Sequence, residues 1–328
     1  MVRIIGPIYD IFETMRRLIV LLMCAPAIVF GQMKIEKIET FHLKDTSFKV
    51  FVDNEVLSTE RWDTLAQPVF WSQVMTLPPD SCIVNIAATR EVLGLASFVE
   101  WKKQTEAEKQ SYKDSVRKHH KLKDDTKIYV TSGKNHFYQV EKVMPSISRA
   151  ISIFEEEKTD PWYAQAILLI ESPGKIEYSN VGAYGPFQLM KSVARSHGLI
   201  VNSKVDERKD FDKSAKGAAS LLRRTCVPEA RRILKKHNIS FEENELWFRL
   251  FVLHIYHAGA GNVQGLMDSI KPKKGGQELI TTMWQSEWGG FKNASQNYSQ
   301  VALASLIRLN DLIYSSCDAI FDCDNVIN

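Results

Sequence analysis

Hydrophobic and polar residues follow two different rhythms along the chain, and the first part is the less regular. "SFKVFVD" (residues 47–53) alternates with a period of two, which predicts a strand. "LPPDS" marks a turn, and Asp80 or Ser81 is the expected cap of a helix over residues 82–122. Residues 126–143 hold another short strand-like piece and a turn. The pattern predicts a mostly helical N-terminal region with a few short strands.

From about residue 145 the pattern becomes consistently helical. Residues 144–157 are amphipathic, and the next helix has Asp160 as its cap and Pro161 at its first position. Helical periodicity then runs through residues 160–172, 214–226, 227–237, 244–259 and 299–314. The fold class predicted is mainly α.

The N-terminus has the pattern of an export signal. Basic residues at 16–17 precede the apolar run "LIVLLMCAPAIVFGQ" (residues 18–32), whose length suits a signal peptide. Val29 and Gly31 favour cleavage before Gln32. An uncleaved anchor is the alternative, but the run is shorter than the ~20 apolar residues of a membrane span and a proline interrupts it.

These patterns predict four parts of the chain. Residues 1–31 hold an over-read start followed by the signal peptide, with Met15 as the true start. Residues 32–144 form an N-terminal region of open role, residues 145–316 the catalytic domain, and residues 317–328 a C-terminal tail.

Composition and charge exclude little but weigh against nucleic acid. The 328 residues are 45% hydrophobic, enough for one large domain or two modest ones, and a net charge of +3 is too mild for a nucleic-acid protein. The charged stretch at residues 100–125 mixes both signs at i,i+4 spacing, which favours a solvated helix face.

Five cysteines allow structural disulfides but indicate no metal site. Without Cys24, which falls in the signal, four remain: Cys82, Cys226, Cys317 and Cys323. In an exported chain they allow three pairings, with Cys317 and Cys323 able to staple the tail. Buried free thiols fit equally well, and no CxxC spacing indicates zinc or redox chemistry.

Glu171 ends the apolar run "AILLIES" (residues 166–172). Burial at the end of such a run disfavours the ionised form and raises the pKa of a carboxyl. A glutamate that keeps its proton near neutral pH can act as a general acid. From Glu171 alone, a glutamate at a helix end that points to water is the favoured interpretation.

The stretch "GAYGPFQLM" (residues 182–190) adds to this picture. Its glycines permit unusual backbone shapes and the close approach of a substrate. Tyr184 and Phe187 offer flat apolar faces of the kind that stack on sugar rings, and Gln188 can both donate and accept hydrogen bonds. The alternative is a tight turn into a helix that begins near Phe187.

A third segment, "IYHAGAGN" (residues 255–262), ends an aromatic-rich helix with Tyr256 and opens a loop with small residues. The alternative is a helix C-cap with a tyrosine in the core. His254 and His257 have a spacing that could hold a metal, but no HExxH motif is present, so we expect no metal and no cofactor.

Taken together, these segments resemble the lytic transglycosylase family with the lysozyme-like SLT fold, nearest its membrane-bound lytic murein transglycosylase D type. The resemblance covers about residues 145–314 and includes the intervening stretch at residues 206–222. The residues that match family motifs are Glu171, Ser172, Gly182, Gly185, Gln188, Met190, Tyr256, Ala258, Gly259, Gly261 and Tyr298. His257 departs from the family's asparagine, and "MKSVA" (residues 190–194) and "PGKIEY" (residues 173–178) also differ.

The resemblance implies a reaction and a set of site residues. Glu171 would act as acid and then base in cleaving the β-1,4 bond between N-acetylmuramic acid (MurNAc) and N-acetylglucosamine (GlcNAc), leaving 1,6-anhydro-MurNAc ends. The implied substrate-binding residues are Ser172, Tyr184, Gln188, Met190, Tyr256, His257 and Tyr298. The implied partner is the glycan strand of peptidoglycan, with residues 32–144 as a candidate surface for a cell-wall protein.

Two alternatives stay open at this point. A hydrolytic muramidase on the same fold would need a second carboxylate, for which Glu177, Asp206 and Glu207 are candidates. A non-catalytic peptidoglycan-binding protein would bind glycan without cutting it. The expected location is the periplasm of a Gram-negative bacterium, with the protein soluble or loosely attached to the envelope after signal cleavage.

Overall fold

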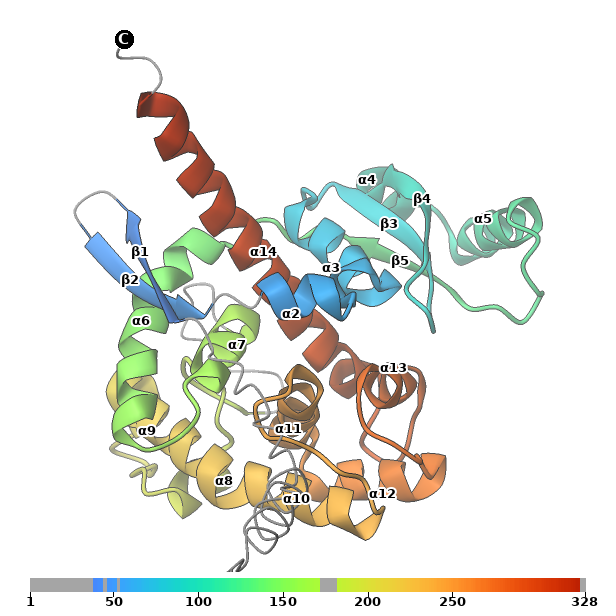
Figure 1. Cartoon of the computed structure of the whole chain (residues 1–328). Helices are drawn as coiled ribbons and strands as arrows, with labels where there is room; N and C mark the ends of the chain where they lie inside the picture. Colours follow the sequence, from blue (N-terminus) through green and yellow to red (C-terminus); the bar gives the residue numbers. More distant parts are fainter. Residues whose placement is uncertain (1–37, 44–45, 52–53, 172–181, 325–328) are drawn as a thin grey trace, which may run out of the picture. The chain divides into compact units, whose positions relative to one another are not determined.

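The structure is a computed structural model that describes residues 38–43, 46–51, 54–171 and 182–324 (Figure 1). It is mainly helical, as the sequence predicts, and the strands among these residues all precede residue 133. The sequence-predicted signal peptide and start site lie outside the described residues. No helix in the described part is both long and apolar enough to cross a membrane.

The first third of the described chain alternates strands and short helices. Its elements are β1 (Ile38–Leu43), β2 (Thr46–Phe51), α2 (Asn54–Thr59), α3 (Ala66–Thr76), β3 (Ser81–Ile86), β4 (Val92–Ser97), α4 (Phe98–Lys103), α5 (Glu106–His119) and β5 (Ile128–Ser132). β1 and β2 form an antiparallel hairpin, and β4, β3 and β5 form a second antiparallel sheet in that order. The strands predicted within residues 47–53 and 126–143 are therefore confirmed.

The remaining elements are helical. They are α6 (Val140–Glu156), α7 (Trp162–Glu171), α8 (Lys191–Ser196), α9 (Phe211–Leu221), α10 (Val227–Lys236), α11 (Leu246–Ala258), α12 (Ala260–Ile270), α13 (Gln277–Gln285) and α14 (Asn293–Asp324). The expected domain boundary at 144/145 falls inside α6, and the boundary expected at residue 317 falls inside α14.

The helix predicted over residues 82–122 is wrong in its first half. Cys82, Ile83 and Val84 are consecutive buried residues, as in a strand covered on both faces. A short polar turn then leads into β4, where Leu95 pairs with Ile83. The charged second half is helical: α5 begins with a capping box and buries none of its residues, which confirms a solvated helix.

The side chain of Arg90 connects the three-stranded sheet to α3 and α14. Its guanidinium is only 5% exposed and donates to Asn293 Oδ1 at 2.9 Å and to Asn297 Oδ1 at 2.7 Å. The same group lies over the rings of Phe70 and Tyr129, with its carbon 5.4 and 5.5 Å from the ring centres. A buried cation with these partners fixes the sheet against the first turns of α14.

α7 forms the centre of the helical part. All residues from Trp162 to Ile170 are buried. Asp160 caps the helix as predicted, because its Oδ1 accepts from the Trp162 N–H at 2.9 Å while Oδ2 accepts from Arg249 Nε of α11 at 2.8 Å. Gln165 bonds the backbone N–H and carbonyl of Phe51, each at 2.9 Å, and so ties the hairpin to α7.

The loop predicted after Tyr256 is a break of one residue. Gly259 has φ 79°, a conformation that favours glycine, and α12 begins at Ala260 directly afterwards. Elsewhere, Cys82 and Cys226 are buried free thiols. Cys24 and the side chains of Cys317 and Cys323 lie outside the described part, so the tail staple stays a prediction.

Candidate active site

Glu171 is the last residue of α7, at the point where the chain leaves a wholly buried helix. Burial raises the pKa of its carboxyl to about 7, and the neighbouring Tyr298 hydroxyl opposes part of that rise. The raised pKa agrees with what the apolar run predicts. Near neutral pH such a carboxyl can both give and take a proton.

Three tyrosines from separate parts of the chain lie within electrostatic range of this acid: Tyr138 before α6, Tyr256 at the end of α11, and Tyr298 on α14. Burial raises the pKa of each hydroxyl, and the nearby charge of Glu171 raises it further. All three hydroxyls therefore stay protonated beside the carboxyl. The motifs singled out Tyr256 and Tyr298, but no local pattern marked Tyr138.

Tyr298 is the tyrosine that acts most directly on the acid. Its hydroxyl lies close enough to Glu171 to lower the pKa of the carboxyl as a hydrogen-bond donor. Its oxygen is nevertheless buried without a partner of ordinary hydrogen-bond geometry among the described residues. Hydrogen bonds at catalytic groups are often loose before substrate binds, and this donor can tighten when the carboxyl ionises.

The stretch from Gly182 to Met190 forms a tight turn against the site. Tyr184 and Leu189 exchange backbone hydrogen bonds at 3.2 Å in both directions. A side chain at Gly185 would meet the carbonyl oxygen of Arg208 at 1.9 Å, and the residue has φ 82°, so only glycine fits. The Gln188 amide donates to the Gly185 carbonyl at 2.9 Å and braces the turn.

One expectation for this stretch is wrong, and the alternative is correct in part. Phe187 is fully buried, with its ring stacked on Phe154 at 5.7 Å and packed against Phe211, so it belongs to the core and cannot line a sugar groove. The alternative, a tight turn into a helix, is confirmed for the turn, but the helix begins at Lys191 and not near Phe187. Tyr184 is also largely buried, beneath the guanidinium of Arg208.

Tyr256 connects the end of α11 to this turn. Its hydroxyl donates to the backbone carbonyl of Phe187 at 2.6 Å. The expected hydrogen bond to Glu171 or to substrate is thus directed to the backbone in this structure. Tyr256 still lies within electrostatic range of Glu171, so the hydrogen bond holds the turn beside the acid.

The remaining predicted site residues differ in their surroundings. His257 stacks on Tyr298, with ring centres 4.5 Å apart, and its Nδ1 lies 3.2 Å from Ser295 Oγ. Met190 is 41% exposed at the start of α8. Ser172 lies outside the described residues.

His254 is committed to a buried network and cannot bind a metal as placed. Its Nδ1 lies 3.0 Å from the Ser295 carbonyl and therefore donates, which leaves Nε2 to accept from Ser299 Oγ at 2.8 Å. Ser299 in turn accepts from Trp284 Nε1 at 2.7 Å. Burial lowers the pKa of His254 to about 3, so the ring is neutral. Within the described ranges no cluster of three potential ligands could hold a metal.

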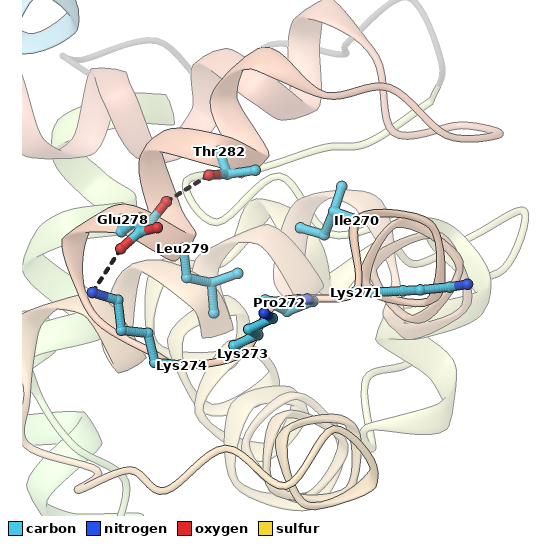
Figure 2. Close-up of a pocket in the computed structure, with 8 residues that line it drawn as sticks. All are labelled: Ile270, Lys271, Pro272, Lys273, Lys274, Glu278, Leu279 and Thr282. Atoms are coloured by element: carbon cyan, nitrogen blue, oxygen red, sulfur yellow. Dashed lines mark hydrogen bonds and ion pairs between the residues drawn. The ribbon is translucent and has the colours of Figure 1, made fainter.

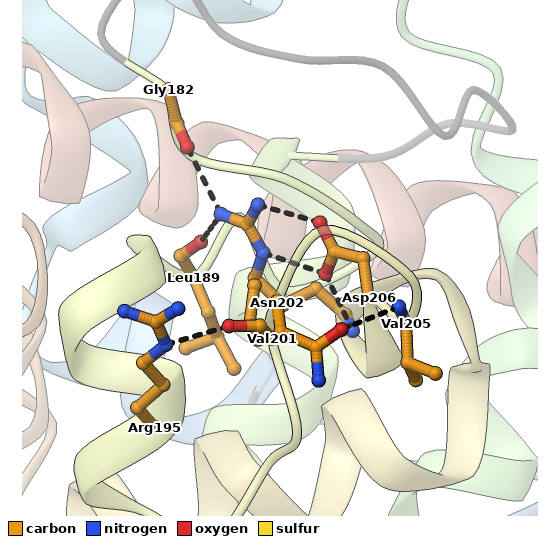
Figure 3. A network of polar contacts seen from close by, with 8 residues as sticks. Gly182, Leu189, Arg195, Val201, Asn202, Val205 and Asp206 are labelled. Atoms are coloured by element: carbon orange, nitrogen blue, oxygen red, sulfur yellow. Dashed lines mark hydrogen bonds and ion pairs between the residues drawn. The ribbon is translucent and has the colours of Figure 1, made fainter.

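Arg208 is the centre of a polar network that contacts the turn, and its partners Gly182, Leu189 and Asp206 are labelled in Figure 3. Its guanidinium is 3% exposed, binds Asp206 through two hydrogen bonds of 2.9 and 2.7 Å, and donates to the carbonyls of Gly182 and Leu189, both at 3.0 Å. The sequence indicated this stretch only through its resemblance to a family. The network fixes both ends of the turn.

Two of the candidates for a second carboxylate, Asp206 and Glu207, are held by hydrogen bonds to other residues. Asp206 is paired with Arg208 as described above. Glu207 accepts from the Ile200 N–H at 2.7 Å and from Lys213 Nζ at 2.6 Å, and these bonds lower the pKa of its carboxyl. Neither is free to activate a water molecule at Glu171. Glu177 lies outside the described residues.

A separate pocket of about 520 Å³ lies where α12 leads into α13 (Figure 2). It is lined by Ile270, Lys271, Pro272, Lys273, Lys274, Glu278, Leu279 and Thr282. None of the predicted site residues lines it, and Lys274 is paired with Glu278 at 2.7 Å. It is not part of the arrangement around Glu171.

Comparison with known proteins agrees with the geometry. Residues 150–275 match the family model described as the Transglycosylase SLT domain. The matched range includes Glu171 and the segments at 182–190 and 255–262, whereas Tyr138 and Tyr298 lie outside it. No curated protein and no solved structure matches the chain significantly.

Proposed function

We propose that this chain is a peptidoglycan lytic transglycosylase. It belongs to the SLT transglycosylase family through its domain at residues 150–275. The observation that carries the proposal is the partly buried acid at the end of α7, Glu171, whose raised pKa of about 7 suits transfer of a proton in both directions. The closer likeness to the D type of the family stays a prediction.

In the first step, Glu171 in its protonated form donates its proton to the glycosidic oxygen between MurNAc and GlcNAc. The bond from that oxygen to the anomeric carbon breaks, and GlcNAc leaves as the alcohol. The acetamido group of MurNAc supports the positive charge that develops at the anomeric carbon. Tyr298 stabilises the carboxylate that remains, because its hydroxyl donates toward Glu171.

In the second step, the carboxylate of Glu171 takes the proton from the C6 hydroxyl of the same MurNAc. The C6 oxygen then attacks the anomeric carbon and closes the 1,6-anhydro ring. The acid is restored to its starting form, and no water is consumed. One carboxyl with a pKa near neutrality serves both steps, which is why a second carboxylate is not required.

The hydrolytic alternative receives less support. A hydrolase of either stereochemistry uses two carboxyl groups, separated by ~5–5.5 Å or ~6.5–9.5 Å. Asp206 and Glu207 are held by their own cationic and backbone partners. Placing an ionisable carboxyl where burial disfavours its charge lowers the stability of the folded state. A protein that only binds peptidoglycan would gain nothing from such a carboxyl in return.

The proposal is tested by mass spectrometry of purified peptidoglycan digested with the protein, with Glu171→Gln as the control. Products lighter by one water than hydrolysis products, and absent with the variant, would support the transglycosylase. Reducing MurNAc ends would establish the hydrolase instead. Intact glycan that stays bound would leave only a binding protein.

We further propose that the protein acts in the periplasm after removal of residues 1–31. The basic residues and apolar run at the N-terminus support this proposal. Expression of the full chain in a Gram-negative host, followed by fractionation and N-terminal sequencing, tests it. A periplasmic product that begins at Gln32 is expected, and an uncleaved product held in the membrane fraction would contradict it.

A further inference from the structure

Trp288 lies in the turn that joins α13 to α14. Figure 1 shows these two helices. The Trp288 N–H donates to the Phe291 carbonyl at 3.1 Å, and the Phe291 N–H donates back to Trp288 at 2.7 Å. Phe291 is fully buried against the ring of His254, at 5.1 Å between ring centres. The turn is therefore anchored in the core although its first side chain reaches the surface.

One face of the Trp288 indole is backed by α12. A Cβ atom built on Gly265 would lie 2.3–2.4 Å from three successive atoms of the six-membered ring. Near-equal distances to three successive atoms place Gly265 over the flat of the ring, because an edge-on approach would bring one atom much closer than its neighbours. Trp288 is nevertheless 44% exposed, so its exposed area lies largely on the opposite face.

Asn262 clamps this turn to the segment that follows Tyr256. Its Nδ2 donates to the Ala258 carbonyl at 2.8 Å, and its Oδ1 accepts from the Gly290 N–H at 2.9 Å. A side chain at Gly290 would meet the Asn262 amide at 2.9 Å, so the glycine permits the contact. The side chain of Asn262 therefore holds two stretches of surface together.

The same segment leads back to the acid. His257, next to Ala258, stacks on Tyr298, and Tyr298 lies against Glu171. Contacts and short stretches of chain thus connect Glu171 through Tyr298 and His257 to Asn262 and the turn that holds Trp288. The exposed indole is the last member of this series.

We propose that Trp288 is a carbohydrate-binding platform, on which a sugar ring of the glycan strand stacks at a distance from the bond that is cut. A pyranose ring has an apolar C–H face, and a rigid indole buries such a face with little loss of conformational freedom. The platform is pre-organised by Gly265 behind it and by Asn262 beside it. The inference rests on the proposed function, because it takes peptidoglycan glycan as the ligand.

The test is a binding measurement with the cleavage-deficient Glu171→Gln chain and purified peptide-free glycan strands. Adding Trp288→Ala is expected to weaken binding about tenfold, and Trp288→Phe, which keeps a smaller ring, less. Adding Gly265→Ala should also weaken binding, because the new Cβ displaces the indole without changing it. Gly94→Ala is the matched control, since its added Cβ meets nothing within 4 Å, and it should bind like the parent.

Thermal melting shows whether each variant is folded. If Trp288→Ala fails to fold, the Phe and Gly265→Ala variants decide the question. Unchanged glycan affinity in these variants would overturn the platform, as would a parent chain that binds no glycan. If the unmutated chain cuts peptidoglycan while the platform variants bind normally, only this inference falls. If the chain binds glycan through Trp288 but never cuts it, only the proposed activity falls.

Discussion

The hydroxyl of Tyr298, on α14, lies against the carboxyl of Glu171, at the end of α7. The acid comes from the domain that matches the SLT family model, and the tyrosine comes from a helix beyond the matched residues. The proton affinity of the acid therefore depends on how α14 is placed. This dependence can be measured through the pH profile.

We expect the rate of cleavage at low substrate concentration to fall as pH rises above about 7, because Glu171 must be protonated to act in the first step. The Tyr298 hydroxyl lowers the pKa of Glu171. Tyr298→Phe should therefore raise that pKa and move the alkaline fall to higher pH. Tyr112→Phe, on α5, is the control and should leave the profile in place; a profile unmoved by Tyr298→Phe would contradict the contact.

Glu171 should also make stability depend on pH. The pKa of its carboxyl is about 7 in the folded protein and near 4.5 ordinarily, so the folded state holds more protons between these values. The free energy of unfolding should consequently fall as pH rises from about 4.5 to 7. Relative to wild type, Glu171→Gln is expected to be about 1–3 kcal/mol more favourable at pH 8 than at pH 4. Urea unfolding at both pH values measures this difference, and a pH-independent difference would argue against a raised pKa at Glu171.

Tyr256→Phe should affect both stability and turnover. The change removes the 2.6 Å hydrogen bond to the Phe187 carbonyl and leaves that carbonyl without this donor. We expect a loss of about 1–3 kcal/mol in the free energy of unfolding, together with slower cleavage because the turn beside Glu171 is released. Denaturant unfolding and initial rates measure the two effects. Full stability with slowed cleavage would point instead to a direct role of the hydroxyl toward substrate.

Arg208→Lys should destabilise the chain far more than the same change at Arg149. A lysine cannot reproduce the paired hydrogen bonds to Asp206 together with those to the two carbonyls. Disrupting a buried pair of this kind costs about 3–5 kcal/mol. The Arg149–Asp212 pair is exposed, so Arg149→Lys should change stability by at most about 1 kcal/mol. Equal effects in thermal and urea unfolding would show that the Arg208 network is not structural.

The helices and the acid could be predicted from the sequence because their signals are local. The cap at Asp160, the apolar run of α7 and the break at Gly259 each lie within a few residues of the feature they determine. β3 escaped prediction because a short apolar run such as "CIVNI" fits a buried helix as well as a buried strand. Its pairing with β4 and with the more distant β5 decides between them.

Side-chain environments were harder to predict than backbone elements. Phe187 has an aromatic ring of the kind that stacks on sugars. That ring is nevertheless packed against Phe154 and Phe211, which are distant in sequence. Tyr138 and Trp288 lie in segments without a recognisable motif, and their positions depend on contacts with other parts of the fold. Such positions follow from tertiary packing, which no local pattern encodes.

The contacts of Arg90 with α14 have a consequence for how much of the chain must be inherited together. α14 carries Tyr298, and the same helix binds Arg90 through Asn293 and Asn297 and accepts a 3.1 Å hydrogen bond from Trp71 through Gln300. A shorter gene that encoded Glu171 and α14 but not Trp71 and Arg90 would leave this face of α14 uncovered. The smallest part of the chain that can be inherited with Glu171 in its present surroundings therefore includes residues outside the family match.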